Sequence, residues 1–410
     1  MVTRARRAML VLALLVSMTA CSHAHAPAAN VPGASTGSSV AVQARQLLTI
    51  EALSPTSLVG LWSDQQSNGV GTVRLAFSAN SGQTWRSVGT ALPRSGQAFP
   101  PPAMAFVSTS GGVVEVEGQV YATTDSGGTW KPAYLGERVT ALSINHGTIW
   151  AVGRRCPPGG GKRDQCAVYL WASTRAHPLV LAERLGGGLV AARYGTDPLL
   201  LRSGAHVGLV TGVGGRPGNN TFVTANLARG WSAASSPCSV TTPVRVRHHR
   251  SVKVTWIGPE AVAAGSGAHP HWWVLCYGQA SAGTETKGLE IATYQRERFV
   301  VEQAYGAWSQ IAAFPSTDPY RNPAHLPTGH VGRLYALSNT ALLQTDQNVL
   351  AVSTDAGRDW RTINGLNFEG DGDWVTFTGG NGEPLWLLVP HVGLWRSPNG
   401  IAGYRSLAAS

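Results

Sequence analysis

Three carboxylates lie close together near the end of the chain, in the run E-G-D-G-D. They are Glu369, Asp371 and Asp373. Hydrolysis of a glycosidic bond needs two positioned carboxylates, which makes these residues the catalytic candidates of the chain. Acids that alternate with glycine also form ordinary polar turns, or wrap a calcium ion. Apart from such a calcium loop, the sequence predicts no metal and no cofactor.

Basic side chains gather in three stretches in the middle of the chain. They are Arg154, Arg155, Lys162 and Arg163, then Arg216, then Arg245, Arg247, His248, His249, Arg250 and Lys253. Without residues 1–20, which hold three of the 32 Lys and Arg, 29 remain against 22 Asp and Glu, a net charge of +7. Such a surface attracts an anionic headgroup, glycan or protein patch, or simply keeps an exported protein soluble. Nucleic acid is not expected, because no nucleic-acid-binding fold signature accompanies the charge.

The elements that position these residues follow from a repeated stretch of eight residues. Each copy has a hydroxyl residue, Asp or Asn two positions on, Gly at four and Trp at seven. The matching residues are Ser78, Asn80 and Trp85, then Thr123, Asp125, Gly127 and Trp130, then Ser353, Asp355, Gly357 and Trp360. Asp or Asn closes a turn by accepting backbone N–H bonds, and Gly supplies the positive φ of a tight hairpin. The pattern therefore predicts hairpins with a Trp in the core of the sheet.

These stretches resemble the Asp-box, or bacterial neuraminidase repeat, of sialidase-like β-propellers. The resemblance implies that each box closes the hairpin between the third and fourth strands of a blade. Weaker copies begin at Ser173, Thr224, Thr293 and Ser397, which gives seven boxes in all. We therefore expect an all-β, seven-bladed β-propeller of four-stranded antiparallel blades. The blades are expected near 47–92, 100–136, 138–184, 187–237, 250–303, 308–366 and 372–410.

Sialidases share this repeat, so a glycoside hydrolase is the alternative function. The resemblance implies an Arg-Ile-Pro motif near the first strand, which this chain lacks before its first box. The run from Tyr320 to Pro323 is only superficially similar to this motif, and it falls in the expected sixth blade. Trp272 and Trp273 could stack on a sugar, but W-W-V-L-C-Y is more typical of a buried strand. We therefore expect a non-catalytic binding or assembly module, as in photosystem assembly-factor-like propellers, with basic loops on the face opposite the boxes.

Four cysteines follow Cys21, an even number that favours disulfides in an exported protein. Four cysteines allow three pairings. The expected blades favour Cys156 with Cys166, which closes a short loop, and Cys238 with Cys276, which joins neighbouring blades.

The first 20 residues have the basic and apolar regions of a signal peptide. They end at M-T-A-C, which resembles a bacterial lipobox with Met18 in place of the usual Leu; the alternative is an ordinary secretory signal. A lipobox would leave Cys21 as an acylated first residue, anchoring the protein to the outer surface of the bacterial membrane. Residues 21–46, rich in Ala, Ser, Gly and Pro, are expected to form a flexible tether. The domain from 47 to 410 is expected to be a monomer.

Overall fold

The computed structural model describes the chain from residue 40 to residue 407, with gaps. The described residues are 40–63, 71–94, 102–133, 135, 138–145, 147–158, 165–174, 177, 179–192, 199–203, 206–212, 220–226, 230–234, 244–245, 251–265, 271–281, 294–304, 307–314, 331–346, 350–363, 366, 375–379 and 383–407. Within these ranges the fold is all-β, apart from the short 3-10 helix η1 (Ala44–Gln46). No helix in these ranges is long and apolar enough to cross a membrane.

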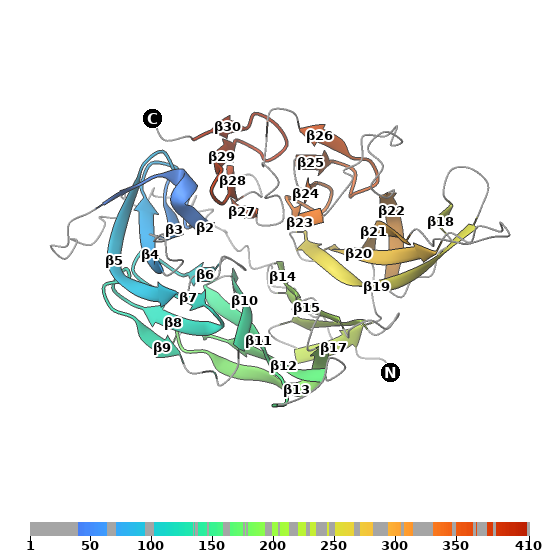
Figure 1. The fold of residues 1–410 in the computed structure, drawn as a ribbon, viewed down its shortest axis with the longest axis horizontal. Helices are drawn as coiled ribbons and strands as arrows, with labels where there is room; N and C mark the ends of the chain where they lie inside the picture. Colours follow the sequence, from blue (N-terminus) through green and yellow to red (C-terminus); the bar gives the residue numbers. More distant parts are fainter. Residues whose placement is uncertain are drawn as a thin grey trace, which may run out of the picture. The chain divides into compact units, whose positions relative to one another are not determined.

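The described strands form small antiparallel sheets, each made of strands that follow one another in the chain (Figure 1). The first sheet has the order β1 (Ala41–Val42), β5 (Trp85–Arg94), β4 (Gly71–Ser78), β3 (Leu58–Ser63) and β2 (Leu47–Ala52). The second contains β6 (Ala103–Phe106), β7 (Gly112–Val116), β8 (Gln119–Thr123) and β9 (Lys131–Ala133). The third contains β10 (Arg138–Asn145), β11 (Thr148–Arg155), β12 (Gln165–Ala172) and β13 (Ala182–Ala192).

Four further sheets are described in the rest of the chain. The fourth contains β14 (Leu199–Ser203), β15 (His206–Gly212), β16 (Asn220–Asn226) and β17 (Gly230–Ala234). The fifth contains β18 (Val244–Arg245), β19 (Ser251–Ala264), β20 (Trp272–Ser281), β21 (Tyr294–Ala304) and β22 (Ala307–Phe314). The sixth contains β23 (Val331–Ala336), β24 (Leu342–Asp346), β25 (Leu350–Ser353) and β26 (Arg361–Ile363). The seventh contains β27 (Thr376–Gly379), β28 (Leu385–Val389), β29 (Gly393–Ser397) and β30 (Arg405–Ser406).

Neighbouring sheets pack face to face in a β-propeller arrangement. The strand β2 contacts β6, and β10 contacts both β6 and β14; β19 contacts β14 and β23. Strands inside the sheets are therefore buried on both faces. All five residues of β7 and all five of β28 are buried, which explains their unbroken apolar runs. Radial stacking of this kind gives a large core to a chain of short strands.

The last sheet packs against the first, although the two exchange no strand. Trp386 and Leu388 of β28 lie in one buried cluster with Val42, Ala44 and Leu58. The backbone N–H of Ala52 in β2 also donates to the hydroxyl of Thr378 in β27, at 2.7 Å. The strand β1 and the helix η1, at the start of the first sheet, thus help to join the two ends of the arrangement.

The repeated box forms a hairpin turn held by its own hydroxyl and carboxylate. Thr123 Oγ1 donates to Asp125 Oδ1 at 2.8 Å and accepts from the N–H of Gly127 at 2.8 Å. Asp125 Oδ1 accepts from the N–H of Thr129 at 2.9 Å, and Oδ2 from the Thr129 hydroxyl at 2.8 Å. The boxes that begin at Ser78 and Ser353 have the same hydroxyl contacts. In the box at Ser397 the hydroxyl accepts from the N–H of Gly400, one position earlier in the turn, and donates to the carbonyl of Ala402 at 2.6 Å. Each of these turns joins the last two strands of its sheet in chain order.

A second repeated turn supports three of the boxes. It joins the first strand to the second in the runs L-S-P-T-S, V-S-T-S-G and L-S-N-T-A, which begin at Leu53, Val107 and Leu337. In the first of them Ser54 Oγ accepts the N–H of Ser57 at 3.0 Å, and the carbonyl of Thr56 accepts the N–H of Ser81. Equivalent bonds join Ser126 to Ser110 and Ala356 to Thr340. Each box therefore docks on a turn of its own sheet, a contact that the sequence analysis missed.

Three sequence expectations differ from the observed strands. Two sheets have a fifth strand, because β1 pairs with β5 and β18 pairs with β19. The fifth sheet extends to Phe314, beyond the expected limit of 303, and its last two strands, β21 and β22, are joined at 305–306 rather than after Thr293. Ser173 forms no box-like bond to its own turn in the described residues. Its hydroxyl instead accepts the N–H of Ile149 in β11, at 2.8 Å.

Candidate functional site

Three arginines lie at one corner of the third sheet, at the end away from its 172–182 hairpin and therefore opposite the box side, although Arg154 and Arg155, as neighbours in one strand, project from opposite faces. Arg138 begins β10 and lies directly across from Arg154 of β11 in the strand register. Arg155 is the last residue of β11. The side chains of Arg138 and Arg155 are exposed, and Arg154 is half-buried. Two of the three, Arg154 and Arg155, come from the predicted binding set; Arg138 was missed, because it stands alone in the sequence.

An aromatic ladder leads from Arg155 into the core. The Arg155 guanidinium carbon lies 5.2 Å from the centre of the Tyr169 ring, a cation–π distance. The Tyr169 and Trp171 rings are stacked at 5.8 Å, and Trp171 is buried between the second and third sheets. These three residues alternate along paired strands, so they share one face of the third sheet. The ladder holds the Arg155 side chain beside the corner while its charge stays in water.

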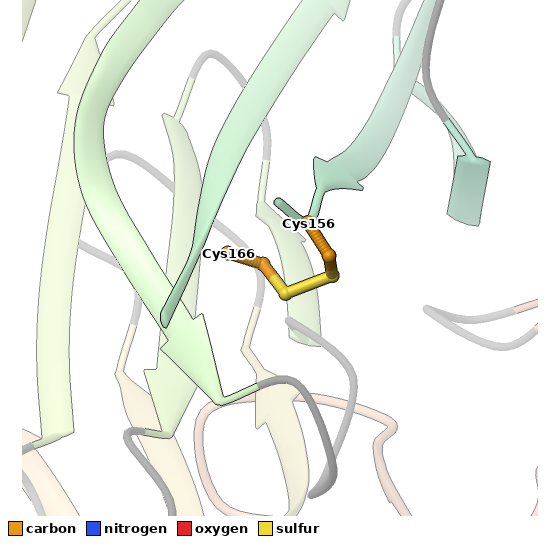
Figure 2. Close-up of a disulfide and its surroundings, with 2 residues drawn as sticks. All are labelled: Cys156 and Cys166. Atoms are coloured by element: carbon orange, nitrogen blue, oxygen red, sulfur yellow. A yellow bond between two sulfur atoms is a disulfide. The ribbon is translucent and has the colours of Figure 1, made fainter. Parts of the chain in front are cut away.

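A disulfide closes the loop that extends from this corner. Cys156 directly follows β11, and Cys166 lies in β12 with no exposed surface. Figure 2 shows the bond between them at the ends of these strands. The loop between the two cysteines carries Lys162 and Arg163, which lie outside the described residues. A crosslink over this short separation of 10 residues favours the folded state by roughly 2–3 kcal/mol in the chain-entropy model.

The second sheet carries acidic groups at the same end as the arginine corner. This end of the two sheets therefore has both positive and negative charges. Glu115 is 8% exposed and accepts backbone N–H bonds from Gly118 and Ala103. Burial lowers the pKa of the Arg94 guanidinium, while the charges of Glu117 and then Glu115 raise it. Arg94 therefore belongs to an internal charge cluster with two glutamates. The arginine corner of the third sheet adjoins this cluster, because the side chain of Arg138 lies against Gly118 and the N–H of Val139 donates to the Gly118 carbonyl at 3.0 Å.

The described carboxylates with printed contacts hold the backbone in place. Glu51 Oε2 accepts the N–H of Phe106 in the next sheet, at 2.9 Å. The pKa of Asp125 is lowered, mainly by the Thr129 N–H bond. For Asp355, burial alone would raise the pKa, but bonds from Asp359, Ser353 and Arg358 lower it overall. Within the described ranges, no three His, Cys, Asp or Glu residues gather as metal ligands would.

Most other predicted site residues lie outside the described part of the chain. These are Cys21, Lys162, Arg163, Arg216, Cys238, Arg247, His248, His249, Arg250, Glu369, Asp371 and Asp373. Arg245 lies in β18, Lys253 in β19 and Cys276 in β20. Trp272 is 6% exposed and Trp273 is fully buried in the cluster shared by the fifth and sixth sheets, so neither offers a face for a sugar.

Comparison with known proteins shows a likeness of fold alone. No protein-family model matches the sequence, and no curated protein matches it. Among solved structures, YCF48 bound to D1 peptide is similar with a TM-score of 0.46 and 12% identity, over 91% of this chain and 100% of that one. A puromycin hydrolase mutant complexed with PGG gives 0.50 and 12%, over 89% of this chain and 54% of the hydrolase. The α-L-arabinofuranosidase Arb93A of Fusarium graminearum gives 0.38 and 11%, over 88% and 92%.

Proposed function

We propose that this chain is an extracytoplasmic binding or assembly module: a seven-bladed β-propeller, exported and anchored through a lipid on Cys21. It docks an anionic partner, an acidic protein patch, glycan or headgroup, on the face opposite the boxes. The pairing of Arg138 with Arg154 carries this proposal. Like charges directly across an antiparallel pair destabilise a sheet. A bound anion would interact favourably with both charges, and Arg155, Lys162 and Arg163 follow in the same stretch of the sequence.

The described carboxylates support a non-catalytic role. Glu51, Glu115, Asp125 and Asp355 each accept backbone N–H bonds that hold a turn or join two sheets. A carboxylate used in this way is stabilised as an ion and is a poor general acid. The alternative, a sialidase-like glycoside hydrolase, depends on Glu369, Asp371 and Asp373, which lie outside the described residues.

Charge reversal at the exposed arginines of the corner tests the proposal. We expect R138E/R155E to weaken binding to phosphatidylglycerol vesicles or to heparin by roughly 30-fold, since each basic residue near an anionic surface contributes about 1 kcal/mol. The matched control is K131E/R405E, which changes the charge equally at two exposed residues on the box side. Equal weakening by both variants would show unspecific attraction. Turnover of a fluorogenic glycoside that is lost on alanine substitution at Glu369, Asp371 and Asp373 would favour the hydrolase instead.

A further inference from the structure

A glutamate stands beside the arginine corner, at the tip of a tight turn in the second sheet. Glu117 and Gly118 form the whole loop between β7 and β8, because Val116 pairs directly with Gln119. Strand β10, which begins with Arg138, contacts both β7 and β8 (Figure 1). The side chain of Glu117 is exposed. A negative charge therefore adjoins the positive charges at this end of the two sheets.

Hydrogen bonds and packing fix this turn to the third sheet. The N–H of Gly118 donates to the Glu115 carboxylate, and the Gly118 carbonyl accepts the N–H of Val139 at 3.0 Å. A Cβ built on Gly118 would lie 2.5 Å from Cγ of Arg138, so the stem of Arg138 lies directly on the turn. These contacts hold the backbone that carries Glu117 beside Arg138.

Glutamate is an unfavourable residue for this position of the turn. The φ of Glu117 is 54° and that of Gly118 is 86°, as a two-residue hairpin of type I′ requires. Asn, Asp and Gly adopt the first position readily, whereas the left-handed conformation strains a longer side chain. Five non-glycine residues of the described ranges have a positive φ, and three of them belong to the box turns. Strain of this kind often marks a functional residue, so the side chain of Glu117 has a role that its turn does not require.

The buried charges nearby leave the negative charge of Glu117 at the surface. Arg94 is 9% exposed and Glu115 is 8% exposed. Although burial lowers the pKa of Arg94, the charges of Glu117 and Glu115 both raise it. One arginine cannot neutralise two glutamates. Because Arg94 and Glu115 are both buried, the excess charge is that of the exposed Glu117.

We propose that Glu117 sets the specificity of the arginine corner. The partner is then a protein segment that places acidic side chains against Arg138 and Arg155 and a basic side chain against Glu117. A uniformly anionic surface, such as lipid headgroups or a sulfated glycan, is repelled at Glu117, whereas a segment with both signs of charge is attracted at each position. Repulsion of the wrong partner is a common source of specificity. This inference rests on the proposed function and narrows its anionic partner to one class.

Removing the charge of Glu117 tests this selection. E117Q keeps the size of the side chain, and we expect it to bind heparin or phosphatidylglycerol vesicles about fivefold more tightly, since one repelling charge is lost. The matched control is E383Q, because Glu383 is exposed on the box side, just before β28. No tightening by E117Q, or the same tightening by E383Q, would overturn the inference. If R138E/R155E leaves this binding unchanged, the proposed site itself fails; if it weakens binding but E117Q has no effect, only the role of Glu117 fails.

Synthetic peptides test the class of partner. The probes are hexaglutamate and peptides in which a single Lys replaces each Glu in turn. Relative to hexaglutamate, we expect E117K to weaken the binding of at least one Lys-containing peptide by about tenfold, because the Lys then meets a like charge. E383K is expected to leave these ratios unchanged. Ratios that are equal in E117K and wild type for every peptide would overturn the protein segment in favour of a glycan or a membrane.

The substitution E117N separates this role from a structural one. Asn is favoured at the first position of a type I′ turn, so we expect E117N to raise the midpoint of urea unfolding. It should also tighten heparin binding as E117Q does, because the same charge is removed. A lower midpoint would mean that Glu117 is retained for its interaction with Arg94, and this would overturn the inference.

Discussion

The indole N–H of Trp386 donates a 3.0 Å hydrogen bond to the backbone carbonyl of Ser81, across 305 residues of sequence. Ser81 lies in the turn of the first box with a positive φ of 61°, and its own N–H donates to Thr56. Trp386 belongs to the middle of the last sheet and is 1% exposed. The first box therefore serves two purposes. It closes a hairpin, and it presents a carbonyl that joins the last sheet to the first.

Replacing Trp386 with Phe should weaken this joint. The smaller ring loses the donor to Ser81, and we expect the free energy of unfolding to fall by about 1–3 kcal/mol. The matched control is W150F: Trp150 is 3% exposed, and its Nε1 has no hydrogen-bond partner among the described residues. The same change of ring there removes no bond and should cost less. Urea unfolding of both variants measures the difference, and an equal loss would contradict a role for the Ser81 bond.

A side chain near the end of an inner strand repeatedly bonds to the backbone of the next sheet. Glu51 of β2 accepts the N–H of Phe106, and Thr378 of β27 accepts the N–H of Ala52. Tyr335 of β23 donates to the carbonyl of Gly379 at 2.5 Å. Each of the three is the residue before the last in its strand. A side chain at this position forms a hydrogen bond with a backbone group on the inner edge of the neighbouring sheet. No further strand of the described sheets pairs with that edge.

Thr378 allows a clean test of that position. T378V keeps the shape of the side chain but leaves the Ala52 N–H without its acceptor, so we expect the free energy of unfolding to fall by about 1–2 kcal/mol. T378S restores the hydroxyl and loses only a methyl group, so it should recover most of the loss. Chemical denaturation of the two variants decides between them. If T378S is destabilised as much as T378V, packing and not the hydrogen bond explains the residue.

Local patterns could predict the hairpins because the hydroxyl and the carboxylate or amide of each box bond to residues within its own turn. The first box predicts strands at 72–77 and 85–90, and β4 and β5 include both ranges. The same reasoning fails where the pattern has lost Gly and Trp. Thr293 precedes β21, and only two residues separate β21 from β22, too few to hold a box. The hydroxyl of Thr293 therefore matches the spacing of the repeat only by coincidence.

Contacts between sheets could not be predicted in the same way. Nothing near Glu51 or Trp386 in the sequence indicates a partner that lies 55 or 305 residues away. The turn at Ser54 did carry a signal, since a Ser-x-Ser/Thr run precedes three of the boxes. That signal becomes informative only when the boxes are already known, because the same run is common in loops. Arg138 was missed for a related reason: its position opposite Arg154 depends on strand register.

Acid should reveal the role of the box carboxylate. The pKa of Asp125 lies below its usual value of 3.8, so the stability it contributes is present above that value and is lost as the pH falls through the lowered pKa. D125N removes the titrating group but keeps the acceptor for Thr129, as Asn80 does for Thr84. We expect wild type and D125N to unfold alike at pH 7, and the stability of D125N to fall less steeply below about pH 4. Urea midpoints at a series of pH values measure this, and identical slopes would contradict it.

Gly89 tests how closely the second box fits against the first sheet. Its φ is +74°, and a Cβ built on it would lie 2.2 Å from the carbonyl oxygen of Gly127. G89A should therefore cost about 3 kcal/mol, from backbone strain and from displacement of the box. Gly147 is the matched control, because its φ is +75° and a Cβ there would have nothing within 4 Å. G147A should cost only the strain, about 1 kcal/mol. Similar losses in thermal or urea unfolding would mean that the box and β5 can separate without cost, so only a clear excess for G89A supports a tight fit.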